Sequence, residues 1–202
     1  IDGGAGASDT AVYTGNFAQY TIARTNDSDP LTITDSRSSG DGEDTVSNTE
    51  ILEFADQTAR VVDAGGYADI PTAVAAAASG DVVLINTAET VSVSLANDIA
   101  TKNLSFSGAS VNTIKDTASN ISSSSIDLTA NGFTRYDTLE VSGSGTVTLD
   151  ASQLGGRALT LTGTFEVTGS ITEVDALDRA TSIDQIDTLT ISDTAAAISG
   201  LS

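Results

Sequence analysis

Short segments of alternating hydrophobic and polar residues recur along the last two thirds of the chain. Each segment is only a few residues long, and Gly, Asn, Asp or Ser residues separate one from the next. Side chains at alternate positions of a strand point to opposite faces of a sheet, so this pattern is typical of strands with one buried face. It therefore predicts a series of short strands, namely VVLI, VSVSL, LSFSG, SIDLT, TLEVSG, TVTLD, LTLTG, TFEVTG and TLTISD.

One stretch in front of these strands has the pattern of a short helix. Asp69 is a suitable N-cap, Pro71 is tolerated in a first turn, and residues 73–78 are alanine apart from one valine. Gly80 ends the helix, and the DVVLI that follows is continuously apolar, as in a strand that is buried on both faces. We expect this helix to cover the open end of a stack of strands.

The first part of the chain reads as a separate small β module. Two alternating segments, Ala11–Tyr13 and Gln19–Ile22, flank a Gly-Asn turn, which is typical of a hairpin. A third strand is predicted at Leu31–Thr34. Ile51, Leu52 and Phe54 then supply apolar anchors after an acidic, glycine-containing loop.

The strands after the helix suit either of two architectures. The small inward residues, the few aromatic residues and the leading helix favour a β-solenoid, whereas the tight SGSGT turn at residues 142–146 favours the hairpins of a β-sandwich. The helix followed by GD and a V/I/L strand resembles the start of right-handed parallel β-helices of the pectate lyase class. We therefore predict an all-β protein with a β module at 1–62 and a right-handed parallel β-helix with a short capping helix at 63–202, truncated at its C-terminal end.

Charge and composition exclude several functions. The chain has 28 acidic and 8 basic residues and a net charge of −20, so no basic surface is available for nucleic acid or for an anionic membrane. It contains no Cys and no His, which excludes disulfides and thiolate chemistry and removes the usual zinc ligand and general base. No apolar run approaches the length that spans a bilayer, so we expect no membrane insertion.

Residues 1–58 carry a GGAG-D-T turn, a tyrosine-ended predicted hairpin, a strand and a DGxDTxxNxExLxFAD segment in this order. The residues that define these features are Gly3, Gly4, Gly6, Asp9, Thr10, Tyr13, Tyr20, Asp41, Gly42, Asp44, Thr45, Asn48, Glu50, Leu52, Phe54, Ala55 and Asp56. Together they resemble a module of large secreted bacterial proteins of the RTX, or hemolysin-type calcium-binding, class. The resemblance implies an extracellular, calcium-associated protein that is secreted by the type I route.

Two groups of carboxylates are candidate Ca²⁺ ligands, because Ca²⁺ takes six to eight oxygen ligands. Asp9 lies one position later than in the calcium-binding nonapeptide of the class, so a single shifted copy is the weaker candidate. Asp41, Glu43 and Asp44, with Asp35 shortly before them, are the better candidates. The alternative is a solvated acidic turn.

An internal repeat points to a segment of a larger surface protein. NTIKDTASNIS at 112–122 and LTISDTAAAIS at 189–199 share a strand and then D-T-A, so Asp116 and Asp193 are each placed to turn the chain and cap a helical turn over Ile121 or Ile198. The segments resemble the SDTAANI-type repeats of giant secreted bacterial surface proteins. That resemblance implies that the repeats continue in a longer parent chain.

From these observations we expect a non-catalytic structural or adhesive segment, as in a surface layer, a fibril or an adhesin stalk. Its expected partners are copies of the same protein or a cell-surface polysaccharide. One alternative is a carbohydrate-binding or carbohydrate-cleaving β-helix with a groove that includes Arg135 or Tyr136. A minor alternative is an ice-binding ladder of the threonine pairs Thr146/Thr148, Thr160/Thr162 and Thr188/Thr190.

Overall fold

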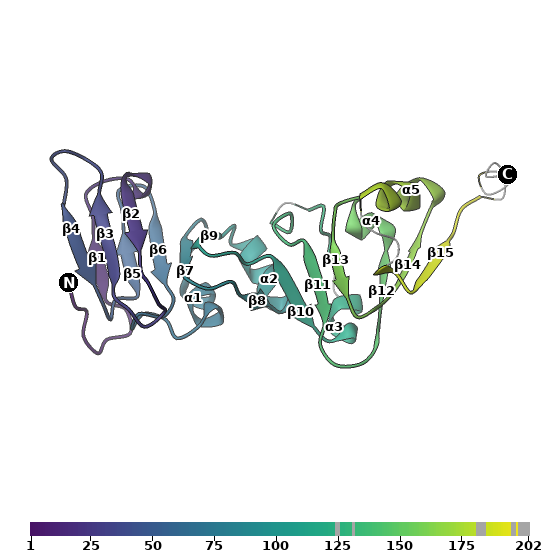
Figure 1. Cartoon of the computed structure of the whole chain (residues 1–202), viewed down its shortest axis with the longest axis horizontal. Helices are drawn as coiled ribbons and strands as arrows, with labels where there is room; N and C mark the ends of the chain where they lie inside the picture. The colour runs from purple at the N-terminus through teal and green to yellow at the C-terminus, as the bar shows by residue number, and fades with distance from the viewer. Residues whose placement is uncertain (124–125, 131, 181–184, 195–196, 198–202) are drawn as a thin grey trace. The chain divides into compact units, whose positions relative to one another are not determined.

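A computed structural model describes residues 1–202 except 124–125, 131, 181–184, 195–196 and 198–202 (Figure 1). The chain divides into two compact units, one made of residues 1–89 with 98–110 and the other of residues 90–97 with 111–202. The predicted domain boundary after residue 62 falls inside the first unit, directly after strand β6 (Thr58–Val61). No helix in the described ranges is long and apolar enough to cross a membrane.

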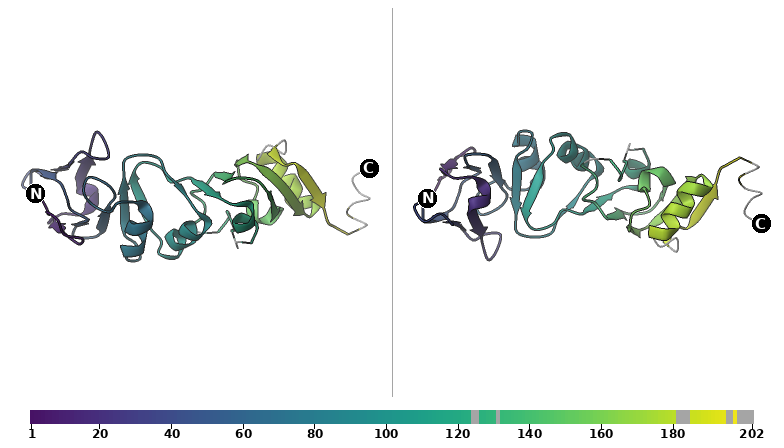
Figure 2. Two further views of the ribbon diagram at one scale, coloured as in Figure 1. Left: turned by 90° about the horizontal axis from the view of Figure 1, so that it is seen from below. Right: turned by 90° about the horizontal axis from the view of Figure 1, so that it is seen from above.

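The first unit contains two sheets (Figure 2). In the larger sheet, with strand order β1-β5-β6-β7-β9, only the β5/β6 pair is antiparallel. The smaller sheet, β2-β3-β4, is antiparallel throughout and follows the 3-10 helix η1 (Phe17–Gln19). The strands are β1 (Thr10–Val12), β2 (Tyr20–Ala23), β3 (Leu31–Asp35), β4 (Glu43–Val46), β5 (Ile51–Glu53), β6 (Thr58–Val61), β7 (Val82–Ile85) and β9 (Ser105–Gly108).

The core of the first unit combines aliphatic side chains with an aromatic cluster. Ile33, Val46 and Leu52 are fully buried in it. Tyr13 stacks on Phe54 with ring centroids 5.3 Å apart, and Phe17 and Tyr20 pack against the same Phe54 ring. Aromatic pairs of this geometry add to the free energy of burial. The predicted hairpin of Ala11–Tyr13 with Gln19–Ile22 is not present, because β1 pairs with β5 and β2 pairs with β3 in the other sheet. The aromatic cluster therefore joins residues from both sheets.

The predicted alanine-rich helix is present as α1 (Ile70–Ala76). The side chain of Asp69 accepts a hydrogen bond from the Thr72 N–H at 2.8 Å, as expected of an N-cap. At the other end, the Lys102 ammonium donates to the carbonyls of Val74, Ala75 and Ala77, and positive charge is favourable there. The helix contacts β7, which is fully buried as predicted. However, β7 lies between β6 and β9 inside the sheet, so α1 does not cover an end of the strand stack.

In the second unit, two parallel sheets alternate along the chain with helices. One sheet has the order β13-β11-β10-β8 and the other β12-β14-β15. The elements are β8 (Thr90–Val91), α2 (Val93–Thr101, which extends into the first unit), β10 (Thr113–Asp116), α3 (Ala118–Ser123), β11 (Thr138–Val141), β12 (Thr146–Asp150), α4 (Ala151–Leu154), β13 (Thr160–Thr162), β14 (Thr164–Gly169), α5 (Ile171–Ala180) and β15 (Thr188–Ile191).

Aliphatic residues stack in register through both parallel sheets. One buried column consists of Val91, Ile114, Leu139 and Leu161 from four successive strands. In the other sheet Leu149 pairs with Val167, which pairs with Leu189. Because the same side of each strand is buried at each step, the register of the ladder is strongly specified.

The prediction of an all-β protein ending in a right-handed parallel β-helix is wrong. The fold is mixed α/β with parallel and antiparallel sheets, and no closed solenoid is detected in the described residues. The predicted VSVSL strand shows the cause. Only Val91 of this segment lies in a strand, and from Val93 the chain is helical, with Val93, Ala96 and Ile99 buried at a helical spacing. The sandwich alternative also fails, because every described strand pair of the second unit is parallel.

Candidate functional site

The loop between β3 and β4 is organised around Asp35, the last residue of β3. The Asp35 side chain has no exposed surface. It accepts hydrogen bonds from the Arg37 guanidinium, at 2.6 Å from Nη2, from the Arg37 N–H at 2.8 Å and from the Asp41 N–H at 2.7 Å. A Cβ atom on Gly40 would lie 2.0 Å from the Asp35 Oδ2 atom, so this close turn requires glycine. The hydrogen bonds to the Asp35 carboxylate thus hold both Arg37 and Asp41 against the end of β3.

Asp41 joins this loop to the segment between β1 and β2. Its carboxylate accepts hydrogen bonds from the Thr14 N–H at 3.1 Å and the Thr14 hydroxyl at 3.0 Å, and from the Tyr20 hydroxyl. Arg37 Nη2 lies 3.3 Å from Asp41 and its guanidinium lies 5.5 Å from the centre of the Tyr20 ring. We call Thr14, Tyr20, Asp35, Arg37 and Asp41 the Arg37 network.

The network shifts the pKa values of its members. Hydrogen bonds from Arg37 hold the pKa of Asp35 well below its usual range, and Asp35 in turn raises the pKa of Arg37. The hydrogen bond from Tyr20 lowers the pKa of Asp41. The pKa of Tyr20 is raised by burial and by this same bond. The two carboxylates and the guanidinium are therefore charged at neutral pH.

The other predicted calcium ligands lie outside this network. Glu43 is exposed on β4 and accepts a hydrogen bond from the Thr34 hydroxyl at 3.2 Å, and Asp44 is opposite Ile33 in the ladder. Asp9 precedes β1 in the larger sheet. Its N–H donates to the buried Glu50 carboxylate at 2.8 Å, and its Oδ2 is buried with no partner in the described residues.

Of the five predicted ligands, Asp35 and Asp41 lie together in the Arg37 network, and Asp9, Glu43 and Asp44 lie outside it. Among the described residues, no group of three or more acidic side chains is arranged to hold a metal ion. The carboxylates of Asp35 and Asp41 already have the Arg37 guanidinium as their positive partner. The sequence signal that reveals this role is the single arginine two residues after Asp35, within an otherwise acidic loop. Calcium binding stays a prediction, and at this loop the ion would compete with Arg37.

The D-T-A repeat gives two matching sites in the second unit. In the first copy, Asp116 accepts hydrogen bonds from the Val93 N–H of α2 at 3.1 Å and from the Thr117 N–H at 2.8 Å. In the second copy, Asp193 accepts from the Ile171 N–H of α5 at 3.1 Å and from the Thr194 N–H at 2.7 Å. Each aspartate thus caps the helix that precedes its own strand in the chain.

The threonine of each repeat accepts a hydrogen bond from the N–H three residues later, and Thr117 thereby caps α3. The Thr117 hydroxyl accepts from the Asn120 N–H and the Thr194 hydroxyl accepts from the Ala197 N–H, both at 3.2 Å. Ile121 is buried under the first turn, as predicted, whereas Ile198 lies outside the described residues. The burial of Ile121 is confirmed, but the predicted cap is wrong: Thr117 caps the helical turn that begins at Ala118, whereas Asp116 caps the preceding helix α2. Sequence reasoning missed this link to the preceding helix.

Two strands at sheet edges carry exposed apolar side chains. Strand β1 is the outermost strand of its sheet and its Val12 is 69% exposed, and β15 is the outermost strand of its sheet and its Ile191 is 41% exposed. With Ile1, they are the large hydrophobic residues that are exposed in the described part of the chain. The free N–H and C=O groups of an edge strand are able to pair with another strand.

The residues proposed for the alternative functions are placed unfavourably. Tyr136 has no exposed surface, and burial raises its pKa to about 12, so it does not line an open groove. In the ladder, Thr148 and Thr188 both pair with Glu166, which interrupts any continuous threonine array. Thr160 and Thr162 belong to the other sheet.

Comparison of the chain with protein-family models, with curated proteins and with solved structures gave no match.

Proposed function

We propose that this chain is a non-catalytic structural or adhesive segment of an extracellular protein, and that it associates with copies of itself through the strands at its sheet edges. The observation that carries the proposal is the repeated D-T-A arrangement, in which two copies make the same pair of side-chain contacts. Each D-T-A repeat connects a strand to the helix that precedes it, so further repeats of the same kind could be added one after another along the chain. Such repetition is typical of repeat proteins, which form elongated structures with extended binding surfaces.

The aliphatic ladder supports a mechanical role. Leu139 and Val167 each lie in an interior strand, with aliphatic partners on both neighbouring strands. Separating two strands would break a row of backbone hydrogen bonds and also expose the stacked side chains to water. A force that pulls two strands apart would therefore be resisted by many contacts along the strand and not by a single one.

The exposed edges supply the surface for association. Val12 and Ile191 place an aliphatic side chain beside unpaired backbone groups, so a strand of another copy would gain hydrogen bonds and bury apolar surface together. The net charge of −20 opposes this association at low ionic strength. Salt or divalent cations would screen the repulsion, so we expect association to increase with ionic strength.

Sedimentation velocity of edge variants tests this proposal. Val12→Lys and Ile191→Lys place a charge on each edge, and edge lysines are a common means of preventing strand pairing. We expect either substitution to reduce association at high salt and the double variant to abolish it. Ser94→Lys, at an exposed position of α2, is the matched control and should associate like the wild type. If the three single variants behave alike, the edges are not the surface of association.

A further inference from the structure

The outer edge of strand β13 is occupied by the side chain of Gln185. The Leu161 N–H donates to Gln185 Oε1 at 2.7 Å, and Gln185 Nε2 donates to the Leu159 carbonyl at 3.2 Å. β13 is the outermost strand of its four-stranded sheet. On its inner side it pairs with β11, and the Thr160 N–H donates to the carbonyl of Asp137 at 2.8 Å. The Gln185 amide therefore lies where the next strand of this sheet would pair.

The two hydrogen bonds of Gln185 have the pattern of a parallel β-bridge. In such a bridge, a residue donates its N–H to the carbonyl one position before its partner, and its C=O accepts from the N–H one position after that partner. The side-chain amide of Gln185 makes both bonds with the residues that flank Thr160, namely Leu159 and Leu161. One side chain thus substitutes for one residue of a neighbouring parallel strand.

The sequence positions of the four strands agree with this substitution. Thr90, Thr113, Thr138 and Thr160 occupy the same register position in successive strands of the sheet. They follow one another at similar intervals along the chain, and Gln185 comes after one more interval of this length. The chain therefore returns to the edge of β13 where a further strand is due, but supplies a side chain there.

Side chains also cover the outermost strand β12 of the other sheet. The Thr148 N–H donates to the Ser122 hydroxyl at 2.9 Å, and the Asp150 N–H donates to Gln153 Oε1 at 2.7 Å. Helix α3 contacts the same strand. At the far side of the four-stranded sheet, β8 has only two residues. Three of the outermost strands in the described part of the second unit are thus covered or very short.

Strand β15 is the remaining outermost strand and its edge is open. The Asp187 N–H donates to the Phe165 carbonyl at 2.9 Å, so Thr188 and Thr190 direct their N–H and C=O groups away from β14. Both threonines are exposed. Among the described residues no group donates to or accepts from this side of the strand. The second unit therefore has one edge that is free to pair and one that Gln185 occupies.

We propose that Gln185 is an edge cap, which closes the four-stranded sheet to a strand of a second copy and leaves β15 as the edge through which the second unit associates. This inference rests on the proposed function and adds which edge is used. Free backbone groups of an edge strand pair with other strands, and native proteins protect such edges. A strand that approaches β13 has to displace both hydrogen bonds of Gln185 before it can form its own.

Gln185→Ala tests the proposal in a chain that also carries Val12→Lys and Ile191→Lys. The alanine leaves the Leu159 carbonyl and the Leu161 N–H unpaired, so self-association at high salt should strengthen about tenfold relative to the double-lysine parent, measured by sedimentation velocity. The reference is that parent, whether or not it associates, so failure of the proposed function and failure of the edge cap give different results.

Gln57→Ala in the same parent is the matched control. It also removes a side-chain amide that donates to a backbone carbonyl, that of Gly80, but it lies beside the interior strand β6 and should not change association. Gln185→Glu retains an acceptor for the Leu161 N–H and places a charge at the edge, so it should resemble the parent. Equal association in the Gln185→Ala and Gln57→Ala chains would overturn the proposal. Far-UV circular dichroism verifies that each variant is folded.

Hydrogen exchange of the wild-type chain, followed by NMR at low salt and low protein concentration, tests the contact itself without any variant. The Leu161 N–H is bonded to Gln185, whereas the Thr190 N–H faces the open edge of β15. After correction for intrinsic rates, the Leu161 amide should exchange about tenfold or more slowly than the Thr190 amide. Equal exchange of the two amides would show that the β13 edge is not capped and would contradict the assignment.

Discussion

The antiparallel sheet of the first unit and the parallel sheets of the second are stabilised in different ways. In the first, Arg37 links the buried Asp35 and the exposed Asp41 to Tyr20, which packs in the aromatic cluster around Phe54. In the second, aliphatic residues repeat at the same register position from strand to strand. The comparison teaches that sheets built from strands of similar length can be stabilised in two ways. The antiparallel sheet depends on one specific side-chain network, whereas the parallel sheets depend on many equivalent aliphatic contacts.

The largest effect is expected in the ladder, at Phe165 on β14. Its side chain is fully buried, and β14 lies between β12 and β15. Phe165→Ala should reduce the free energy of unfolding of the second unit by about 3–5 kcal/mol, measured by urea denaturation. Thr164→Ala, at the exposed neighbouring position, should cost less than about 1 kcal/mol. A similar loss in both variants would show that the ladder core does not carry the stability.

The next effect concerns the Arg37 network and depends on pH. Because the folded pKa of Asp35 lies below its unfolded value of about 4, its stabilising contribution is present above that pH and is lost as the pH falls below it. Asp35→Asn should therefore lower the unfolding midpoint at pH 7, and the difference from the wild type should shrink as the pH falls from 5 toward 2. Asp98→Asn, at an exposed position of α2, should show no such dependence. A difference that grows in acid would contradict this account.

A smaller effect is expected at the repeat, where one aspartate serves two backbone donors. Asp116→Ala removes the acceptor of the Val93 and Thr117 N–H groups and should cost about 1–2 kcal/mol. The Val93 and Thr117 N–H groups donate to different oxygens of Asp116, and Asp116→Asn retains only one acceptor oxygen, so it should recover about half of that loss. Thermal unfolding monitored by circular dichroism compares the two variants. Equal losses from both would mean that the charge, and not the hydrogen bonding, stabilises this turn.

The smallest effect is expected from calcium, and it tests whether Arg37 and the ion compete for the carboxylates of the loop between β3 and β4. Since Arg37 occupies the carboxylates of Asp35 and Asp41, the ion has to replace it in order to bind there. Calcium should therefore raise the melting temperature at least twofold more in Arg37→Gln than in the wild type, each measured against a chelator control. Arg37→Lys retains the charge and should resemble the wild type. A larger calcium shift in the wild type would contradict competition at this loop.

Local features of the fold were predictable from the sequence, but the pairing of the elements was not. The buried strand β7, the alternating strands β12 and β14 and the cap of α1 by Asp69 follow from local patterns. Helix α2 was missed because its first residues continue the alternation of β8, while its start is fixed by Asp116 from a later strand. A contact between residues so far apart in sequence leaves no local signal.

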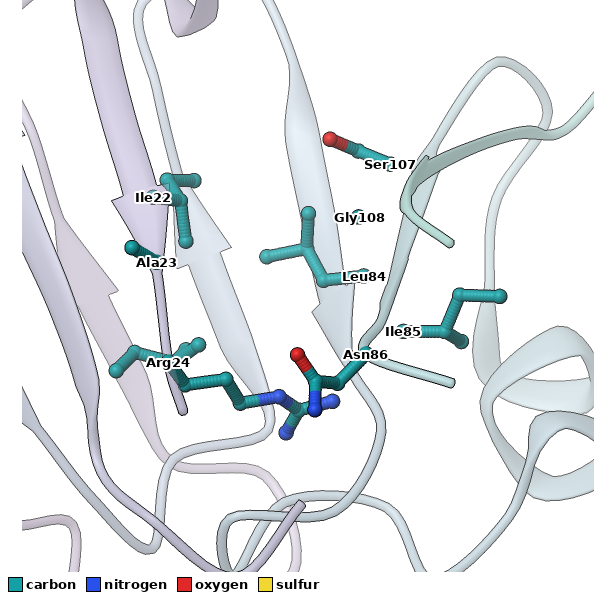
Figure 3. A pocket seen from close by; sticks show the side chains of 9 residues that line it. Ile22, Ala23, Arg24, Leu84, Ile85, Asn86, Ser107 and Gly108 are labelled. Atoms are coloured by element: carbon teal, nitrogen blue, oxygen red, sulfur yellow. The ribbon is translucent and has the colours of Figure 1, made fainter. Parts of the chain in front are cut away.

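The candidate sites were predictable to a similar extent. The sequence placed Asp35 and Asp41 in one loop, and the structure brings them together through Arg37. The pocket in the first unit (Figure 3) could not be predicted, because its lining comes from the β2, β3, β7 and β9 regions, and their juxtaposition depends on the packing of two sheets.

Sedimentation velocity of the wild-type chain over a range of protein concentrations, at low and at high salt, tests the central claim of association most directly. The account predicts that the sedimentation coefficient rises with protein concentration, and rises more steeply at high salt where the repulsion between copies is screened. A single monomeric species under all these conditions would contradict it.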